Sequence, residues 1–385
     1  MTDSVKIGVS GTGFIAKGLI SLLASTDDMK VVSILTRRPI ETVEDIPERQ
    51  ALTNDIETFL KNADLIVECS GDVIHGSEVI DHAFKMNLPV VTMNSELQVT
   101  TGSYFAKRGF ITEAEGDQPG CLAALHENAV SMGFKPLVYG NIKGFMNLNP
   151  SPEDMRYWSK TKGISLPMVT SFTDGTKVQI EQALVANGLH AGILADGLTG
   201  ETVENIEIGG LSLAEKTEFH GKPISDFVVC RQGPPGVFIT ARHDGNQKEA
   251  LSYLKLGEGP YYTLSTSFHL CHLEIIKTIR RVVDGKGILL NNTAHPSVSV
   301  KAVAKRDLVA GEKISQGIGS FTVRGEACSI EDNPDHLPIG LLSQAVIEKP
   351  VKAGETLTFS NVSIPESFAL NAWKDIIKDT RPVFS

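Results

Sequence analysis

The chain has 385 residues, of which 41% are hydrophobic and 21% are charged, and its formal net charge is −10. These values are typical of globular proteins, and the length accommodates about two or three domains. The acidic balance argues against nucleic acid or an anionic membrane as the main partner, and no apolar run approaches the roughly 20 residues of a membrane span.

The chain begins with a strand, a glycine turn and a helix. Lys6–Ser10 has the pattern of a buried strand, and Phe14–Leu23 has that of a helix. In dinucleotide-binding folds such a turn lets the backbone approach a pyrophosphate, which lies at the helix N-terminus. We therefore predict that the residues of the turn and of the first helical positions bind a dinucleotide: Gly11, Thr12, Gly13, Phe14 and Ile15.

The next predicted strand, Lys30–Leu35, bears on the choice of cofactor. An acid at its end would bind the ribose 2′-hydroxyl of NAD, whereas an arginine accommodates the 2′-phosphate of NADP. The sequence offers Arg37 and Arg38, and no acid before Glu41. It therefore predicts NADP(H), with ordinary solvated loop charge as the alternative interpretation.

Two further apolar segments are Ala63–Asp72, a strand that runs into a small-residue turn, and Leu88–Asn94; a helix-like stretch over Ser77–Met86 separates them. This alternation is typical of parallel β-α-β units and predicts a Rossmann-type doubly wound parallel sheet. Ligands of such sheets bind at the carboxyl ends of the strands. The cofactor contacts predicted there are Ser70, Gly71, Asn94 and Glu96, although the last two could equally cap a helix.

The segment V-V-T-M-N at residues 90–94, together with the glycine turn, resembles the nucleotide-binding half of homoserine dehydrogenases. Residues 113–120 and 170–177 are more similar to a group of homoserine-dehydrogenase-like oxidoreductases with a C-terminal SAF module. That group includes enzymes described as deoxyxylulose-phosphate-reductoisomerase-like. The resemblance covers essentially the whole chain, and it makes Asp117 and Gln118 candidate substrate contacts.

Residues 121–137 are predicted to be helical, with Leu122, Leu125, Ala129 and Met132 as the inward stripe. The following strand over residues 136–144 places Lys143 at a strand end. The segment from Asn147 to Pro167 has weak periodicity and is interpreted as a loop or lid. Its cations could bind an anionic substrate, or they could simply be solvated.

The helix predicted over Val178–Gly188 has Asp174 as its expected N-cap, and it is the favoured carrier of the chemistry. Lys177 and Glu181 lie one turn apart on one face. Hydride delivery to a carbonyl leaves an alkoxide, which an ammonium can stabilise and protonate. The alternative is an ordinary surface ion pair. The predicted catalytic residues are Lys177, Asp174, Glu181 and Lys143.

Homoserine dehydrogenases use an Asp and a Lys four residues apart on a comparable helix, whereas Asp174 and Lys177 are three apart. Residues 201–217 are predicted to form a short strand-like stretch and turns. His269, His272 and Glu274 lack the spacing of a zinc site and are interpreted as structural, so the metal site is unknown. Tyr262 and His269 are candidate substrate contacts, because this segment approaches the active site in the resembling family.

The C-terminal region repeats itself, because Ala302–Ala304 and an A-G-E turn recur 43 residues later at Ala345–Ile347 and a second A-G-E turn. The repeat predicts a small β-rich domain that resembles the SAF module. The predicted organisation is a dinucleotide-binding domain over 1–140, a catalytic domain over 141–292, part of which can return to the Rossmann core, and an SAF-like domain over 293–385.

These features predict an NADP(H)-dependent oxidoreductase that reduces a carbonyl of a small, phosphorylated, sugar-like substrate. The resemblance adds a preceding skeletal rearrangement, as in reductoisomerases, that yields a branched polyol phosphate. Such a step would need a divalent cation, Mg or Mn, or a cationic clamp. The alternatives are homoserine dehydrogenase and a non-catalytic NADP(H)-binding sensor.

The five cysteines are scattered and show no C-x-x-C spacing, so we expect reduced thiols and neither a zinc knuckle nor a disulfide framework. We expect a soluble cytoplasmic protein, since the N-terminus lacks a charged leader with an apolar segment. The expected partner is a small-molecule substrate, with no nucleic acid and no membrane, and the expected state is a homo-oligomer.

Overall fold

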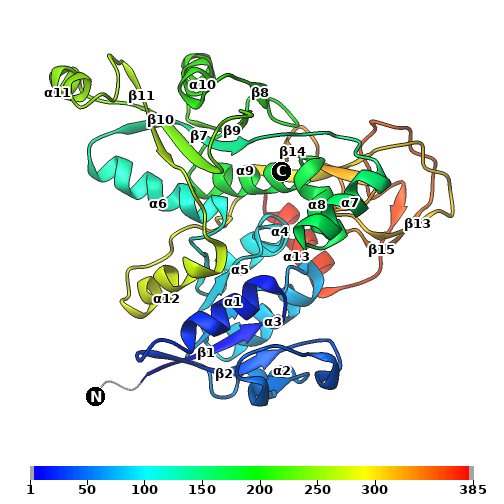
Figure 1. The fold of residues 1–385 in the computed structure, drawn as a ribbon. Coiled ribbons are helices and arrows are strands. Elements are labelled where there is room, and N and C mark those ends of the chain that lie inside the picture. The colour runs from blue at the N-terminus through cyan, green and yellow to red at the C-terminus, as the bar shows by residue number, and fades with distance from the viewer. Residues whose placement is uncertain (1–3, 381–385) are drawn as a thin grey trace. The chain divides into compact units, whose positions relative to one another are not determined.

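The computed structural model describes residues 4–380, which form two compact units (Figure 1). The nucleotide-binding unit consists of the residues up to Gly120, His269–His295 and the residues from Ser367 onward. The catalytic unit consists of Cys121–Phe268 and Pro296–Glu366. The predicted boundaries at 140 and 292, with part of the central region able to return to the Rossmann core, stay predictions.

The nucleotide-binding unit is built on a six-stranded sheet in the order β3-β2-β1-β4-β5-β6, in which all neighbours are parallel. The order reverses between β1 and β4, which is the point where ligands bind in doubly wound sheets. The predicted fold class is therefore confirmed. The strands are β1 Val5–Ser10, β2 Met29–Leu35, β3 Leu52–Thr53, β4 Leu65–Glu68, β5 Val90–Thr92 and β6 Ile111–Glu113.

Helices cover both faces of this sheet. Adjacent strand residues point to opposite faces, and accordingly Val67 and Ile66 belong to different apolar clusters. Helices α1 (Phe14–Leu23) and α12 (Ile275–Val283) pack in the cluster of Val67. The cluster of Ile66 contains residues of α2 Ile56–Leu60, α3 Val73–Lys85, α4 Ser95–Leu97 and α5 Ser103–Ala106.

The helix α13 (Phe368–Thr380) also packs on this unit. Its first residue, Phe368, stacks on Phe105 of α5 with ring centroids 6.0 Å apart. An ion pair of 2.7 Å joins Asp379 to Lys107. Residues far apart in sequence thus complete one hydrophobic layer.

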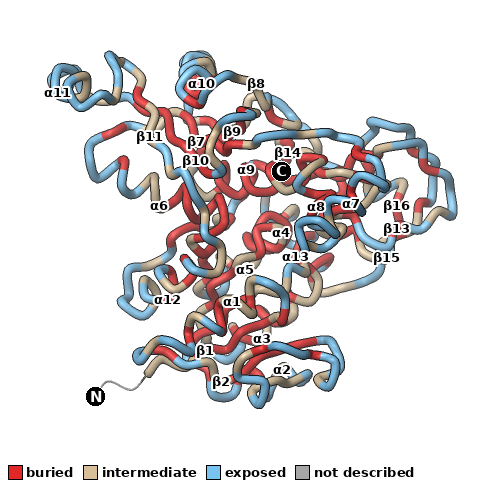
Figure 2. Tube along the Cα trace, in the orientation of Figure 1, coloured by how far each residue is buried: buried red, intermediate tan, exposed pale blue. Residues whose placement is uncertain are grey.

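The catalytic unit contains a mixed sheet in the order β11-β10-β7-β9-β8, in which β7 and β9 are parallel. Tyr139 of β7 packs with α6 (Gln118–Ser131) and α9 (Thr176–Gly188), whereas the neighbouring Val138 packs with α10 (Ile206–His220). Figure 2 shows that α9 is buried. The strands are β7 Lys135–Lys143, β8 Glu201–Thr202, β9 Ile224–Val229, β10 Gly236–Arg242 and β11 Tyr261–Thr266.

The C-terminal strands of the catalytic unit form two small sheets, β12-β14 and β13-β15-β16. The first of these packs on α9, where the Gly325 N–H donates to Thr176 Oγ1 over 2.9 Å. The glycines of the two A-G-E turns, Gly311 and Gly354, both have φ near +84° (+83° and +85°). The strands are β12 Val298–Ala304, β13 Lys313–Gln316, β14 Val323–Ser329, β15 Ser343–Ile347 and β16 Val362–Ser363.

The predicted loop between Asn147 and Pro167 is wrong, because the segment contains α7 (Pro152–Lys162) and the start of α8 (Leu166–Thr173). The Ser151 side chain caps α7 by accepting the Asp154 N–H, and Gly163 ends the helix in the left-handed region. Only Met155 of α7 is buried. Capping and charge therefore define this helix, and its sequence has no apolar stripe from which it could be predicted.

Two further corrections concern helices. Residues 206–220 form α10, not turns, because Asn205 caps the helix and its two glycines are packing positions. A Cβ at Gly209 would lie 2.8 Å from Val228, and one at Gly210 would lie 2.2 Å from the Thr240 hydroxyl. Met132 was expected to face inward, but α6 ends at Ser131 and Met132 is 54% exposed.

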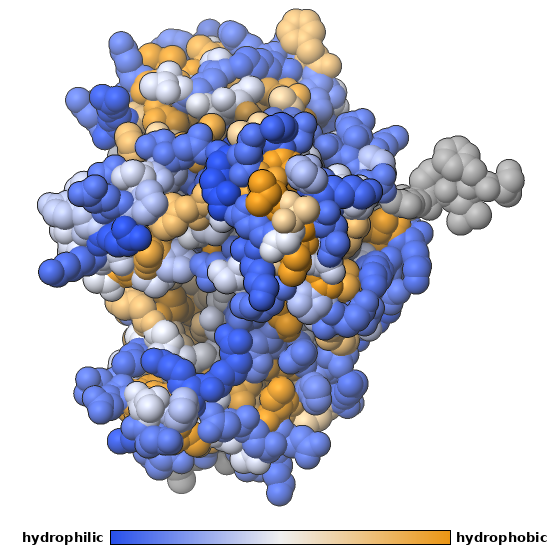
Figure 3. All heavy atoms as spheres, turned by 90° about the vertical axis from the view of Figure 1, so that its right-hand side faces the viewer, coloured by the Kyte–Doolittle hydropathy of each residue, from blue (hydrophilic) through white to orange (hydrophobic). Residues whose placement is uncertain are grey.

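In the part of the chain that the structure describes, no helix combines the length and the apolar character needed to cross a membrane. On the face turned to the viewer in Figure 3, hydrophilic residues predominate and hydrophobic residues form separate patches. This distribution agrees with the net charge of −10.

Candidate functional site

The glycine turn after β1 has the geometry that a dinucleotide requires. Gly11 has φ +118°, and a Cβ there would lie 2.8 Å from the Cys69 carbonyl oxygen. Gly13 is the N-cap of α1, no side chain caps this helix end, and a Cβ at Gly13 would meet open space. Phe14 and Ile15 form the first positions of α1. The uncapped N–H groups fit a pyrophosphate.

Two guanidinium groups lie beside this turn. Arg38 donates to the Thr12 carbonyl oxygen over 2.9 Å, and Thr12 Oγ1 lies 3.3 Å from Thr36 Oγ1. Arg37 pairs with Asp72 at 2.7 Å. The structure therefore brings the predicted Arg37 and Arg38 to the carboxyl edge of the sheet, next to the turn.

The other predicted cofactor contacts follow β4 and β5. The Ser70 N–H donates to Glu68 over 2.8 Å, and Gly71 has φ +66°. Asn94 caps α4, because its Oδ1 accepts the Leu97 N–H over 3.0 Å, and Glu96 lies in the same short helix. Asn94 thus caps α4, and it lies at the carboxyl edge of the sheet, after β5.

The buried Glu68 lies at the end of β4. Burial raises the pKa of this carboxyl, although hydrogen bonds from Ser70, Asn94 and Thr92 act in the opposite direction. Its hydrogen bond to the Ser70 N–H fixes the backbone of the turn after β4.

Three of the predicted substrate contacts lie in the nucleotide-binding unit, and the fourth does not. Ser95 Oγ donates to Asp117 over 3.2 Å, and Gln118 Nε2 lies 3.3 Å from Nε2 of His269. Tyr262 belongs to the catalytic unit, is 3% exposed and packs in its core. Tyr262 is therefore a packing residue of this core.

A buried carboxylate in the catalytic unit accepts hydrogen bonds from two polar side chains of β7. Glu181 is 1% exposed, and its Oε2 accepts from Asn141 Nδ2 over 2.8 Å and from Lys143 Nζ over 3.3 Å. Asn141 and Lys143 share a face of β7 because they are two residues apart. Lys177 lies on α9 one turn before Glu181. We call Asn141, Lys143, Lys177 and Glu181 the lysine–glutamate cluster.

Asn141 is the member of this cluster that sequence reasoning missed. The signal was available, since a polar residue stands two positions before Lys143 in an otherwise apolar strand. Asn141 is fully buried and its Oδ1 has no hydrogen-bond partner among the described residues.

Asp174 has a different role from the predicted N-cap. Gly175, with φ +84°, occupies the N-cap position, and Asp174 Oδ1 accepts the Thr176 N–H over 2.8 Å. The other carboxylate oxygen pairs with Lys305 at 2.6 Å, where both side chains are buried. Burial lowers the pKa of Lys305, and Asp174 acts against that change. Lys305 lies 131 residues from Asp174 in sequence, so no local pattern could predict this ion pair.

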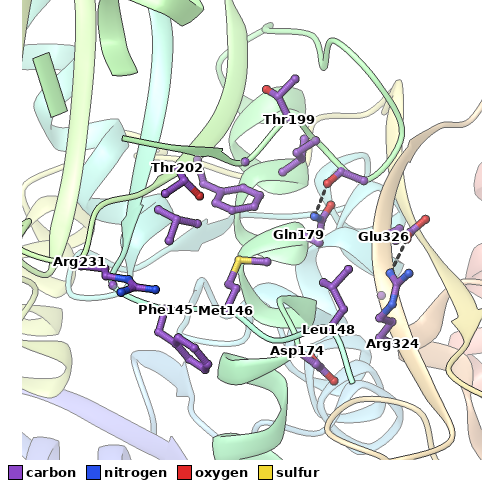
Figure 4. Close-up of a pocket in the computed structure, with 17 residues that line it drawn as sticks. Phe145, Met146, Leu148, Asp174, Gln179, Thr199, Thr202, Arg231, Arg324 and Glu326 are labelled. Atoms are coloured by element: carbon purple, nitrogen blue, oxygen red, sulfur yellow. Dashed lines mark hydrogen bonds and ion pairs between the residues drawn. The ribbon is translucent and has the colours of Figure 1, made fainter. Parts of the chain in front are cut away.

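A cavity of about 440 Å³ adjoins α9 within the catalytic unit (Figure 4). Gln179 lines it, and its direction from the helix axis differs by about 200° from that of Glu181, two residues on. The cavity and the lysine–glutamate cluster therefore lie on different flanks of α9. Its labelled lining residues include Phe145, Met146, Leu148, Asp174, Thr199, Thr202, Arg231, Arg324 and Glu326.

The predicted acids do not fit a divalent cation. Asp174 is neutralised by Lys305, and Glu181 accepts from Lys143 and Asn141. Asp117 belongs to the other unit. Among residues 4–380, no group of three or more His, Cys, Asp or Glu side chains is arranged to hold a metal ion.

The chain was compared with known families and proteins. Residues 116–275 match the family model described as "Oxidoreductase DRL, catalytic domain". This match covers 160 of the 385 residues and supports an oxidoreductase. The oxidoreductase prediction is thus confirmed at this level, whereas the resemblance to homoserine dehydrogenases and to reductoisomerase-like enzymes stays a prediction.

No curated protein matches the chain. Among solved structures, a probable dehydrogenase from Thermotoga maritima is 14% identical over 75% of this chain and 91% of that chain, with a TM-score of 0.44. A UDP-N-acetylglucosamine 3-dehydrogenase from Acidithiobacillus ferrooxidans is 10% identical over 76% and 93%, with a TM-score of 0.43.

Proposed function

We propose that this oxidoreductase uses NADP(H) to reduce a carbonyl of a small, anionic, sugar-like substrate at the lysine–glutamate cluster. The observation that carries the proposal is the buried Glu181 carboxylate, which holds the Lys143 ammonium at the carboxyl end of β7. Lys177 lies one helical turn from the same carboxylate.

The residues of the nucleotide-binding unit support the choice of cofactor. Gly11 and Gly13 leave room for a pyrophosphate at the uncapped start of α1. Arg37 and Arg38 stand where a ribose 2′-phosphate is bound in folds of this kind. A nicotinamide dinucleotide held there would supply the hydride.

Lys143 is the group that we assign to the developing oxyanion. An ammonium in a buried setting stabilises negative charge more strongly than in water, and it can also donate a proton. Glu181 accepts one hydrogen bond from Lys143, which fixes the ammonium. Asn141, two residues earlier on β7, donates to the same carboxylate oxygen. No other acceptor for Lys143 Nζ occurs among the described residues, so further N–H donors are available to a substrate.

The charge of the cluster supports an anionic substrate. Lys143 donates to Glu181, and Lys177 lies one helical turn before Glu181 on α9. Ammonium groups suit a sugar phosphate, in agreement with the resemblance to reductoisomerase-like enzymes. Two ammoniums could also clamp neighbouring oxygens during a skeletal rearrangement, after which reduction would give a branched polyol phosphate.

The test is NADPH oxidation by the purified protein with a panel of phosphorylated ketoses and aldehydes, with and without magnesium. We expect turnover with at least one phosphorylated substrate, a weaker response to its dephosphorylated form, and loss in Lys143→Met. Oxidation of homoserine in its place would assign the homoserine dehydrogenase alternative. NADPH binding without turnover on any member of the panel would favour the sensor.

A further inference from the structure

The cavity on the second flank of α9 is separate from the lysine–glutamate cluster. It lies within the catalytic unit between the end of β9, the segment 197–202 and β14. Phe227 and Val229 of β9 line it, two residues apart on the strand face that α9 covers. Gln179 closes the α9 side through a hydrogen bond of 2.5 Å to the Gly197 carbonyl oxygen.

The charges that line the cavity are unequal. Asp174 is paired with Lys305, and Glu326 is paired with Arg324. Arg231 also lines the cavity, and it has no acceptor among the residues that the structure describes. Figure 4 shows Arg231 and Arg324 on opposite sides of the pocket, with Met146 between them. The lining thus carries one guanidinium that no carboxylate neutralises.

The space between the two arginines is apolar. Phe145, Met146 and Leu148 contribute side chains from the segment that follows β7, and Phe227 contributes a ring from β9. A cavity of about 440 Å³ lies within the range of small-molecule sites, which bind apolar bodies and orient them by a few polar groups. A guanidinium is well suited to a phosphate or carboxylate, since it can donate two parallel hydrogen bonds.

We propose that this cavity is an effector site for a small anion with an apolar body, whose phosphate or carboxylate group pairs with Arg231. The site is distinct from the catalytic cluster and does not depend on the reaction proposed above. Gln179 lines the site from one flank of α9, while Lys177 and Glu181 lie on the other. A bound ligand therefore contacts the helix that carries two members of the cluster.

Isothermal titration calorimetry with three probes tests the proposal on the full chain: phenyl phosphate, inorganic phosphate and benzyl alcohol. We expect phenyl phosphate to bind with one site per chain and at least tenfold more tightly than either of the other two. The difference follows because only phenyl phosphate combines the apolar body with the charge. Turnover, where measurable, should change in the same concentration range.

Three variants locate the binding. Arg231→Met should weaken the binding of phenyl phosphate at least tenfold. The thermal midpoint should stay unchanged, because Arg231 is exposed and unpaired among the described residues. Thr202→Trp should abolish binding by filling the cavity. Lys143→Met, the matched control on the other flank, should bind as the unmodified chain does. Binding that survives Arg231→Met but is lost in Lys143→Met would overturn the proposal, as would equal binding of phenyl phosphate and benzyl alcohol.

Discussion

The Lys143 ammonium lies 3.3 Å from Oε2 of Glu181, and the side chains are 16% and 1% exposed. A carboxylate so deeply buried is stable as an anion only with partners that offset its lost hydration. Lys143 and Asn141 are two such partners. Changes at this pair should therefore affect both stability and chemistry.

We predict that Lys143→Met lowers kcat by about 100-fold or more, the usual contribution of a positioned general acid. Lys216→Met is the matched control, because Lys216 forms an ion pair with Glu201 in the same unit but away from the cluster. Steady-state kinetics with NADPH and the active substrate measure both. Equal losses in the two variants would contradict a catalytic role for Lys143.

The two glycines of the turn should respond differently to alanine. Gly11→Ala should destabilise the protein by about 1–3 kcal/mol, because its φ of +118° is strained for any other residue and its Cβ meets Cys69. Gly13→Ala should leave the thermal midpoint nearly unchanged, since a Cβ at this position has no neighbour within 4 Å. It should nevertheless weaken NADPH binding. Calorimetry and NADPH titration separate the two effects. Full NADPH affinity in Gly13→Ala would contradict a pyrophosphate at this turn.

Arg37→Met should raise the Kd for NADPH by about tenfold or more and leave that for NADH within about twofold, because only NADPH carries the 2′-phosphate. Arg37 is exposed and its partner is Asp72, so the fold should tolerate the change. Arg280→Met provides the control, as a guanidinium of the same unit paired with Asp28. Equal weakening of both cofactors would point to NAD(H).

Lys305→Met should destabilise the catalytic unit by about 3–5 kcal/mol, because it leaves the Asp174 carboxylate buried without its counterion. Lys352→Met removes the same charge from the exposed pair with Asp307, and we expect almost no change. Thermal unfolding at neutral pH compares them. A double variant, Lys305→Met with Asp174→Asn, should recover part of the loss.

Glu68→Gln should change the pH dependence of stability. The pKa of Glu68 is raised above its ordinary value of 4.5 by burial, so the folded state binds the proton more tightly than the unfolded state does. The contribution of Glu68 to stability is therefore complete below pH 4.5 and is lost as the pH rises through the folded-state pKa. Thermal midpoints from pH 4.5 to 8 should fall less steeply in Glu68→Gln, with Glu57→Gln as the exposed control.

Much of the nucleotide-binding unit could be predicted from the sequence. The strand, turn and helix from Val5 to Leu23 follow from an apolar run, two glycines and a helical stripe, all of which are local patterns. The helix α7 was missed because its stability comes from Ser151 and Gly163 at its ends, with only Met155 buried.

The candidate site was less accessible to sequence reasoning. Lys143 and Glu181 were both chosen as candidates, but their contact depends on how α9 packs on β7, and no spacing along the chain encodes that. The pairing of Asp174 with Lys305 spans 131 residues and was invisible for the same reason. Residue types at element ends were predictable, and their partners were not.

The helix α13 has a consequence for synthesis on the ribosome. The sheet of the nucleotide-binding unit emerges first, but Phe368, which helps to cover the residues around Phe105, is translated after the whole catalytic unit. A nascent chain that has not reached residue 367 presents an incomplete apolar layer. Folding of the first unit therefore finishes after folding of the second can begin, and a chain truncated before α13 should depend on chaperones although its glycine turn is intact.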